Sequence, residues 1–444
     1  MNRISANILY SGFGELLLFG LSFLLSVITA WYLGAAGRGR FWILYNAAGL
    51  LIIIFSMRFS SSITFHLSKN KERVGEAILY ALFVGLAAVF CVALVANLFS
   101  GFLYNILLKE ISTEWPVLVL ICFSYYLWTL IIAVIEGLML FHAKAIFMGA
   151  SHFIKLLSVI YAVGVLNLEF DGLILFMGAA ETIVYSMIIL FFLFRANHFR
   201  VNGREFHAML KYSAGSFPGA ISNFYTLRID GFFLNYFSGP AEVGVYSIAS
   251  SLIMMILYVP AAIRNVLMPY IASSADRAIT PKLSRLLIMA MALLSLSLIP
   301  LVWVSVIPIY GVEFHFSRDL FLLLLPGSIF WGVFLLISSD IDGRGFPFRV
   351  SRVLIASAFT TVGMGLVLIP LWNAAGAAIV CSLSHALTMT LIIRVYNRMV
   401  EGNFSQLLIP KQEDIYRFMK IAHDCADNLR EGFTLKFWAK KPGI

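Results

Sequence analysis

Charged residues are scarce in this sequence: Asp, Glu, Lys and Arg make up 12% of its 444 residues. A typical soluble domain has about 25% charged residues. Hydrophobic residues account for 61% of the chain, and the mean hydropathy is +0.90. Uncharged runs such as residues 16–34 match the roughly 20 residues that a helix needs to cross the hydrocarbon of a bilayer. This composition excludes an ordinary soluble domain and predicts an all-α polytopic membrane protein, with its first apolar run retained as a helix.

The sequence also lacks the common signatures of catalysis and of metal or nucleotide binding. Its four cysteines form no CxxC pair, and three of them lie inside apolar runs, which argues against a disulfide framework. It contains neither a P-loop (GxxxxGK followed by Ser or Thr) nor an HExxH motif. We therefore predict that the protein is not an enzyme, has no catalytic or metal-binding residues and no cofactor, and works as a transporter powered by an ion gradient.

The formal net charge of +9 could indicate nucleic-acid binding, but the positions of the basic residues argue against it. Most of the 32 Lys and Arg lie near the two ends of the chain and in alternate loops between apolar runs. The intervening loops hold only Arg38, Arg40, Lys109 and Arg318. This bias follows the positive-inside rule and predicts that both termini are cytoplasmic. The expected surroundings are therefore membrane lipids, and no nucleic-acid partner is predicted.

The apolar runs predict about twelve membrane-spanning helices that are joined mostly by short loops. A polar and basic segment at the midpoint divides them into two groups of six. We predict an N-terminal lobe (1–195), a cytoplasmic linker (196–211), a C-terminal lobe (212–398) and a cytoplasmic tail (399–444). The predicted spans are 8–33, 41–66, 77–100, 115–138, 145–166, 172–195, 212–237, 241–267, 285–308, 317–338, 350–370 and 373–396.

The tail has apolar residues at helical spacing from Ile415 to Leu429, with charged residues on the other faces. This pattern predicts an amphipathic helix. Such a helix would lie on the cytoplasmic membrane surface or pack on the cytoplasmic end of the bundle, and the sequence does not decide between the two.

The two halves of the chain are similar to each other at a nearly constant shift. Because each half has an even number of spans, both begin on the same side of the membrane, and parallel repeats around a central cavity are expected. Chance identity of a few glycines is the alternative, but the matched arginines and acid–glycine pairs favour a true repeat. The matched residues are Gly34 and Gly239, and Gly39 and Gly244, at a shift of 205, and Arg58 and Arg264, and Glu136 and Asp342, at a shift of 206.

Polar residues form a stripe along one face of the first predicted span and of the seventh. Each stripe includes one acid. The stripes either line a water-filled cavity or serve the close packing of small residues between helices, and the acids favour the cavity. The two stripes consist of Ser11, Glu15, Ser22, Ser26 and Thr29, and of Ser216, Gly219, Asn223, Thr226 and Asp230.

Charged residues inside the predicted spans are the best candidates for function, because a charge there costs about 2.5–3.5 kcal/mol on insertion scales. Arginine matches phosphate with a planar fork of donors. For Arg58 and Arg264, which lie toward helix ends, an alternative is that the side chains snorkel to the headgroups. The candidates for substrate binding are Arg228, Lys155, Arg58 and Arg264, and those for ion coupling or charge pairing are Glu15, Asp230 and Glu181.

Several motifs match the pattern of one known family. They are Arg228-Ile-Asp230, Ser238-Gly239-Pro240 and Val243-Gly244-Val245-Tyr246 in the middle of the chain, WYLGAAGRGRFW at 31–42, RNVLMPYIAS at 264–273 and DGRGFPF at 342–348. Ala35 stands where proline is common in the family's first loop. On these motifs, residues 5–398 resemble the polysaccharide flippases of the multidrug/oligosaccharidyl-lipid/polysaccharide exporter superfamily.

The resemblance implies two six-helix lobes around a central cavity, and alternating access. It implies a flippase in the bacterial inner membrane that moves undecaprenyl-pyrophosphate-linked oligosaccharide to the outer leaflet, for O-antigen, capsule or exopolysaccharide assembly. The implied partners are the lipid-linked oligosaccharide, a coupling cation (Na⁺ or H⁺) and other polysaccharide-assembly proteins.

Two alternatives remain open at this point. One is a multidrug or cation antiporter of the same superfamily, although the excess of basic residues argues against a cavity for cations. The other is a membrane-embedded polysaccharide polymerase or glycosyltransferase, although the longest predicted outer loop, at about 101–114, is short for such an enzyme.

Overall fold

This computed structural model has helix in all twelve predicted spans, but a turn at Met57 and Arg58 divides the span that was predicted at 41–66. It describes residues 2–109, 111, 114–196, 199, 202–273, 279–400, 407–416 and 419, with the backbone alone for residues 2–19, 102, 103, 107, 141, 142, 265, 266, 268–270, 272 and 273. The elements are α1 (Asn2–Phe55), α2 (Phe59–Lys69), η1 (Lys71–Arg73), α3 (Val74–Leu98), α4 (Ser100–Phe102), η2 (Leu103–Leu107), α5 (Trp115–Gly137), α6 (Phe141–Gly164), α7 (Phe170–Phe194), α8 (Gly203–Ser238), α9 (Pro240–Ser273), α10 (Ile279–Tyr310), η3 (Val312–Phe314), α11 (Ser317–Gly343) and α12 (Pro347–Val400).

Two of the long helices are bent into pairs of spans. Gly34 breaks α1 with φ +63° and ψ −173°, a conformation essentially confined to glycine. Asn373 breaks α12 in the same way, three residues after Pro370. Among the described residues, nine helices are long and apolar enough to cross a membrane. Counting α1 and α12 twice and adding the more polar α8, which has 36 residues, gives the twelve spans that were predicted.

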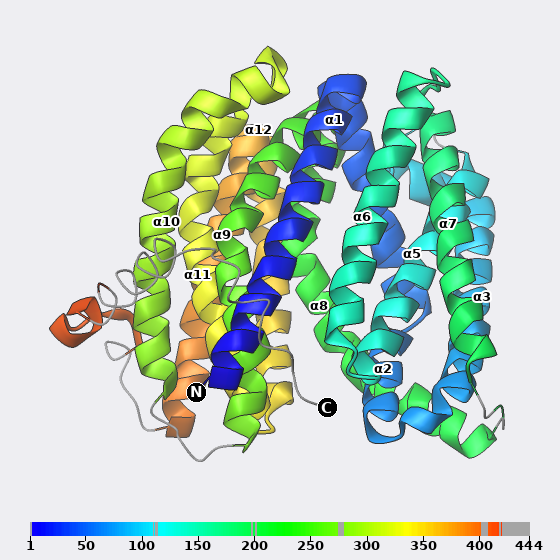
Figure 1. Cartoon of the computed structure of the whole chain (residues 1–444). Coiled ribbons are helices and arrows are strands. Elements are labelled where there is room, and N and C mark those ends of the chain that lie inside the picture. Colours follow the sequence, from blue (N-terminus) through cyan, green and yellow to red (C-terminus); the bar gives the residue numbers. More distant parts are fainter. Residues whose placement is uncertain are drawn as a thin grey trace, which may run out of the picture.

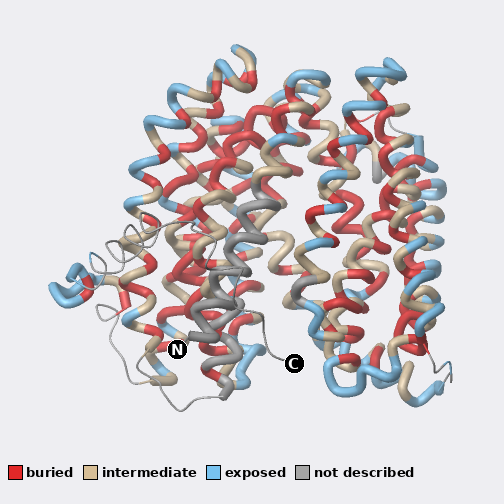
Figure 2. Tube along the Cα trace, in the orientation of Figure 1, coloured by how far each residue is buried: buried red, intermediate tan, exposed pale blue. Residues whose placement is uncertain are grey.

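The helices form two groups, with α1 passing between them (Figure 1). One group contains α3, α5, α6 and α7, and the other contains α9 to α12. Buried residues lie along the inside of each group, and exposed residues, many of them apolar, lie along the outside (Figure 2). A bilayer satisfies no backbone hydrogen bonds, so an apolar exterior made entirely of helix is the expected arrangement for a membrane protein.

The midpoint segment differs in part from the predicted linker of residues 196–211. Helix α8 begins at Gly203, where the side chain of Asn202 accepts a hydrogen bond from the amide of Arg204 and caps the first turn. The beginning of α8 packs on the first group of helices, where the rings of Tyr212 and Phe65 are stacked with centroids 4.4 Å apart. This helix therefore connects the two groups directly.

The described part of the tail packs on the second group. Leu407 is buried against α11 and α12, and the carboxylate of Asp414 accepts a hydrogen bond of 2.5 Å from Arg285 of α10. These contacts attach the described part of the tail to α10, α11 and α12. The rest of the predicted amphipathic helix, to Leu429, lies outside the described residues.

Candidate functional site

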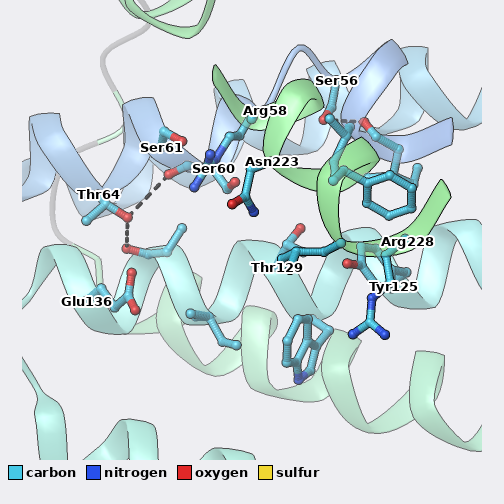
Figure 3. A pocket seen from close by; sticks show the side chains of 18 residues that line it. Ser56, Arg58, Ser60, Ser61, Thr64, Tyr125, Thr129, Glu136, Asn223 and Arg228 are labelled. Carbon is cyan, nitrogen blue, oxygen red and sulfur yellow. Dashed lines mark hydrogen bonds between the residues drawn. The ribbon is translucent and has the colours of Figure 1, made fainter. Parts of the chain in front are cut away.

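A cavity of about 400 Å³ lies between the first group of helices and α8 (Figure 3). Its walls come from the end of α1, the turn that follows it, α2, α5 and α8. The volume falls within the usual range for small-molecule sites, about 300–1,000 Å³. Its lining includes the polar residues Ser56, Arg58, Ser60, Ser61, Thr64, Tyr125, Thr129, Glu136, Asn223 and Arg228.

Two helices present one regular face each to this cavity. The residues of α5 that line it recur every three or four positions from Tyr125 to Glu136, and those of α8 do so from Ala220 to Arg228. This spacing places them on a single side of each helix. The cavity is thus built on rigid helices, which hold the side chains in a fixed arrangement.

Arg58 reaches the cavity because the chain leaves the helical path just before it. Met57 and Arg58 have φ of +48° and +54°, and they form the turn between α1 and α2. Two consecutive non-glycine residues with positive φ cost about 1–3 kcal/mol each. No local motif indicates this turn. A strained turn that carries an exposed arginine into a cavity supports a functional role for that arginine.

Arg228 and Asp230 lie on different faces of α8, as their separation of two residues predicts. Arg228 lines the cavity, with its guanidinium 5.7 Å from the centroid of the Trp42 ring. Asp230 is buried on the other side, where its carboxylate accepts hydrogen bonds from the hydroxyl of Tyr246 and, at 2.8 Å, from the amide of Gly231. Of the predicted stripe on α8, only Asn223 lines the cavity, and Asp230 is instead engaged by Tyr246 of α9.

The guanidinium groups of Arg58 and Arg228 form no hydrogen bond and no ion pair with any residue that the structure describes. Each guanidinium has five N–H donors. Other arginines of the chain are well supplied with acceptors: Arg38, for example, donates four hydrogen bonds of 2.6–3.0 Å. The donors of Arg58 and Arg228 are therefore available to a ligand in the cavity.

The charge of the cavity is positive. Glu136 is the one carboxylate among the described residues that line it, and it is paired with Lys144 through a hydrogen bond of 2.7 Å. The two arginines are thus not balanced by acids within the cavity. An anionic ligand fits this charge, whereas a cationic ligand would be repelled.

Arg264 does not line this cavity. It is exposed, and it is near enough to Arg58 for the two positive charges to repel each other. Each arginine is also near an acid of its own half: Arg58 interacts with Glu136, and Arg264 interacts with Asp342. The four residues are the pairs that the shift of 206 relates. The equivalent arginines of the two halves therefore lie within electrostatic range of each other.

Lys155 and Glu181 form an ion pair away from the cavity. The ammonium of Lys155 lies 3.4 Å from the carboxylate of Glu181 and 5.0 Å from the ring centroid of Tyr45. Glu181 is buried and also accepts a hydrogen bond of 2.7 Å from Ser124. Neither residue of the pair lines the cavity, and the side chain of Glu15, the remaining acid, lies outside the described part of the structure.

The opposite end of the interface between the halves, near Gly34, is closed. Arg38 is 6% exposed and donates hydrogen bonds to Ser26 and Thr29 of α1 and to Ser247 of α9. The hydroxyls of Ser26 and Tyr310 lie 3.1 Å apart and extend the network to α10. Ser26 and Thr29 of the predicted stripe on the first span therefore belong to this network instead of lining the cavity, and Ser26 bonds directly to the second half.

Sequence reasoning missed the part of the site that α5 contributes. Tyr125, Trp128 and Thr129 lie in an uncharged apolar run, where aromatic residues are as expected on a lipid-facing side as on a cavity wall. Their spacing of three and four residues was the available signal, but it does not show which face points inward. No cluster of three metal-ligating side chains exists among the residues described.

Comparisons with known proteins agree with this architecture. A family model described as "Polysaccharide biosynthesis protein" matches residues 4–275, and no curated protein sequence matches the chain. The lipid II flippase MurJ in an inward closed conformation superposes with a TM-score of 0.64 at 13% identity, covering 100% of this chain and 94% of that one. An inward-facing multidrug resistance MATE family transporter of the MOP superfamily gives 0.69 at 13% identity, covering 86% and 94%. A MOP superfamily transporter from Pyrococcus furiosus gives 0.61 at 11% identity, covering 89% and 95%.

These likenesses define the class: the protein is a multi-pass membrane protein with the fold of the MOP superfamily transporters. The family model spans more than half of the sequence, and it identifies the chain more closely. The chain belongs to the polysaccharide biosynthesis protein family. The resemblance and the fold class inferred from the sequence are both confirmed.

Proposed function

We propose that the protein is a flippase that moves undecaprenyl-pyrophosphate-linked oligosaccharide across the cytoplasmic membrane by alternating access. The observation that carries this proposal is the pair of arginines, Arg58 and Arg228, which line one cavity between the halves and whose donors have no partner in the described part of the chain. A pyrophosphate cannot cross hydrocarbon without hydrogen-bonding partners, because burying an unpaired charge in an apolar medium has a large free-energy cost. The lipid tail is apolar, so it needs no polar partners and can stay in the bilayer.

Arginine suits this task better than lysine, because its planar fork forms two parallel hydrogen bonds to phosphate oxygens. In the proposal, Arg58 and Arg228 contact the pyrophosphate and Arg264 attracts it by its charge. Lys155, which the sequence suggested as a further contact, is paired with Glu181 outside the cavity. We therefore assign Lys155 the role of a charge partner for that acid.

Coupling to an Na⁺ or H⁺ gradient is assigned in this proposal to the buried carboxylates Glu181 and Asp230, with Glu15 as a further candidate. Acids inside membrane helices are costly and are commonly kept for ion or proton pathways. In this proposal the basic loops and both termini are cytoplasmic, as the positive-inside rule predicts. The cavity would then be reached from the cytoplasm, since the halves are closed at the end near Gly34.

The test uses cells whose surface polysaccharide depends on this protein. The double variant Arg58→Gln/Arg228→Gln is expected to lower surface polysaccharide by about tenfold or more, because charged hydrogen bonds contribute about 1.5–3 kcal/mol each. Lipid-linked oligosaccharide should accumulate in the inner leaflet at the same time. Arg349→Gln, which removes an arginine outside the cavity, is the matched control. Unchanged polysaccharide in the double variant at a normal protein level would reject the proposal.

A multidrug or cation antiporter is not favoured by the structure's charges. Such a transporter needs a cavity that attracts cations, and the cavity here holds two arginines and one acid that is already paired. A drug-resistance assay in a strain without its own pumps separates the two functions. The antiporter would be favoured if the wild-type protein protected cells against cationic drugs and a Glu136→Gln variant did not.

A further inference from the structure

We propose that the cavity face of α5 selects the sugar: Trp128, flanked by Tyr125 and Thr129, is the platform on which the saccharide unit next to the pyrophosphate stacks. This inference rests on the proposed flippase function and deepens it. It assigns two tasks to two walls of the same cavity, with arginines for the charged group and an aromatic surface for the sugar.

The residues of the cavity are separated by chemistry as well as by helix. The positive charges, which form no ion pair with the residues described, come from the turn after α1 and from α8, whereas α5 contributes Tyr125 and Trp128 and places Thr129 beside them. Arg228 is near Tyr125, so the two walls meet at one end of the cavity (Figure 3). A ligand whose charged group is bound by Arg228 would therefore present its next unit to the α5 wall.

Trp128 packs against the core of the first group of helices with only part of its side chain and is not fully buried in it. Its neighbours Tyr126, Leu127 and Leu130 are at most 2% exposed, while Trp128 is only half-buried. The rings of Trp128 and Tyr125 are tilted by 45° with centroids 5.9 Å apart, so they are not stacked face to face. The indole therefore keeps a surface that a ligand in the cavity can cover.

The polar atoms of this wall are also free to bind. Neither the indole N–H of Trp128 nor the hydroxyl of Tyr125 forms a hydrogen bond with any residue in the described ranges. The hydroxyl of Thr129 donates to the carbonyl of Tyr126 at 2.8 Å, which leaves its lone pairs as acceptors. Asn223 across the cavity adds an amide with both donors and an acceptor.

A sugar matches this combination better than other uncharged groups do. One face of a pyranose ring consists of C–H groups and stacks on an aromatic ring, while its hydroxyls point outward and need donors and acceptors. A purely apolar ligand would leave the polar groups of the wall unpaired, which costs about 1–3 kcal/mol for each buried group. The cavity of about 400 Å³ is at the lower end of the range for ligand sites, so it would hold the part of the headgroup nearest the lipid.

The test measures binding to the purified full-length protein in detergent by isothermal titration calorimetry. The probes are farnesyl diphosphate and three farnesyl diphosphates that carry one glucose, one galactose or one N-acetylglucosamine. Wild-type protein is expected to bind at least one glycosylated probe about tenfold more tightly than farnesyl diphosphate. Trp128→Leu should reduce this ratio to about threefold or less, leave the affinity for farnesyl diphosphate unchanged, and be partly rescued by Trp128→Phe.

Trp372→Leu is the matched control, because Trp372 is 53% exposed at the bend of α12 and does not line the cavity. It should bind all four probes like the wild type. A wild-type protein that binds all probes equally would overturn the sugar platform and leave the flippase proposal standing. An equal loss for every probe in Trp128→Leu would also overturn it. Wild-type protein that binds no diphosphate would instead reject the proposed function itself.

Discussion

Gly39 and Gly244 occupy equivalent positions in the two halves of the chain, and each is packed against the backbone of the other half. A Cβ added to Gly39 would lie 1.7 Å from the carbonyl oxygen of Pro240, and one added to Gly244 would lie 1.9 Å from that of Ala35. Pro240 follows Ala35 by the same shift of 205 that relates the two glycines. The contact is therefore reciprocal, as expected where two similar lobes meet around an axis of approximate two-fold symmetry.

The first prediction concerns this contact. Gly39→Ala and Gly244→Ala should each lower the free energy of unfolding by about 1–3 kcal/mol, because the added methyl group collides with backbone that cannot move aside without shifting a helix. The measurement is the thermal midpoint of the purified protein, followed by intrinsic fluorescence.

Gly363→Ala in α12 is the matched control, because nothing lies within 4 Å of a Cβ at that position. Alanine favours a helix over glycine by about 1 kcal/mol, so this variant should be as stable as the wild type or more stable. The same decrease in all three variants would show that the close contact of the two halves is not the cause.

The second prediction concerns Arg38, which holds the end near Gly34 closed. It donates hydrogen bonds to the part of α1 before the bend and to α9. Arg38→Gln removes a charged fork that a neutral amide cannot replace, and we expect easier opening of this end. The measurement is the rate at which a thiol reagent labels Cys in a Ser247→Cys variant. The double variant Arg38→Gln/Ser247→Cys is compared with Ser247→Cys alone, which retains Arg38. Labelling that is no faster in the absence of Arg38 would contradict its role in closure.

The third prediction concerns the ion pair of Lys155 and Glu181. Lys155→Gln leaves a buried carboxylate without its partner, and should therefore destabilise the protein more than the double variant Lys155→Gln/Glu181→Gln does. We expect a coupling energy of about 1–3 kcal/mol from a double-mutant cycle of thermal stability. Additive effects of the two substitutions would show that the pair contributes no interaction of its own.

The membrane spans could be predicted because length and hydropathy determine them: a helix of about 20 apolar residues matches the thickness of the bilayer hydrocarbon. The bends at Gly34 and Asn373 lie at boundaries between consecutive predicted spans. The sequence did not show that the chain would remain helical directly before and after each bend. The repeat was visible in the matched glycines and arginines. These features depend on residues that are close in the sequence or on its overall pattern.

The details of the site depend on contacts between distant segments, and those could not be predicted. Asp230 shares a helical face with Asn223 on an ideal wheel, but the hydroxyl of Tyr246 on the next helix engages its carboxylate. Arg58 reaches the cavity through a turn of positive φ that no local motif announces. Lys155 was expected in the cavity, and only the packing of α6 on α7 shows that Glu181 is its partner.

The last prediction uses the repulsion between Arg58 and Arg264, two equivalent arginines that lie within range of each other's charge. An anion between them would relieve this repulsion, so inorganic pyrophosphate should raise the thermal midpoint of the wild-type protein. A ligand whose free concentration is 100 times its dissociation constant stabilises the folded state by about 2.7 kcal/mol. Arg58→Gln and Arg264→Gln should each shift the pyrophosphate concentration needed for half of this effect upward by about tenfold, while Arg349→Gln should not. Equal stabilisation of all four proteins would mean that pyrophosphate binds elsewhere, and that the two halves do not share an anion at this place.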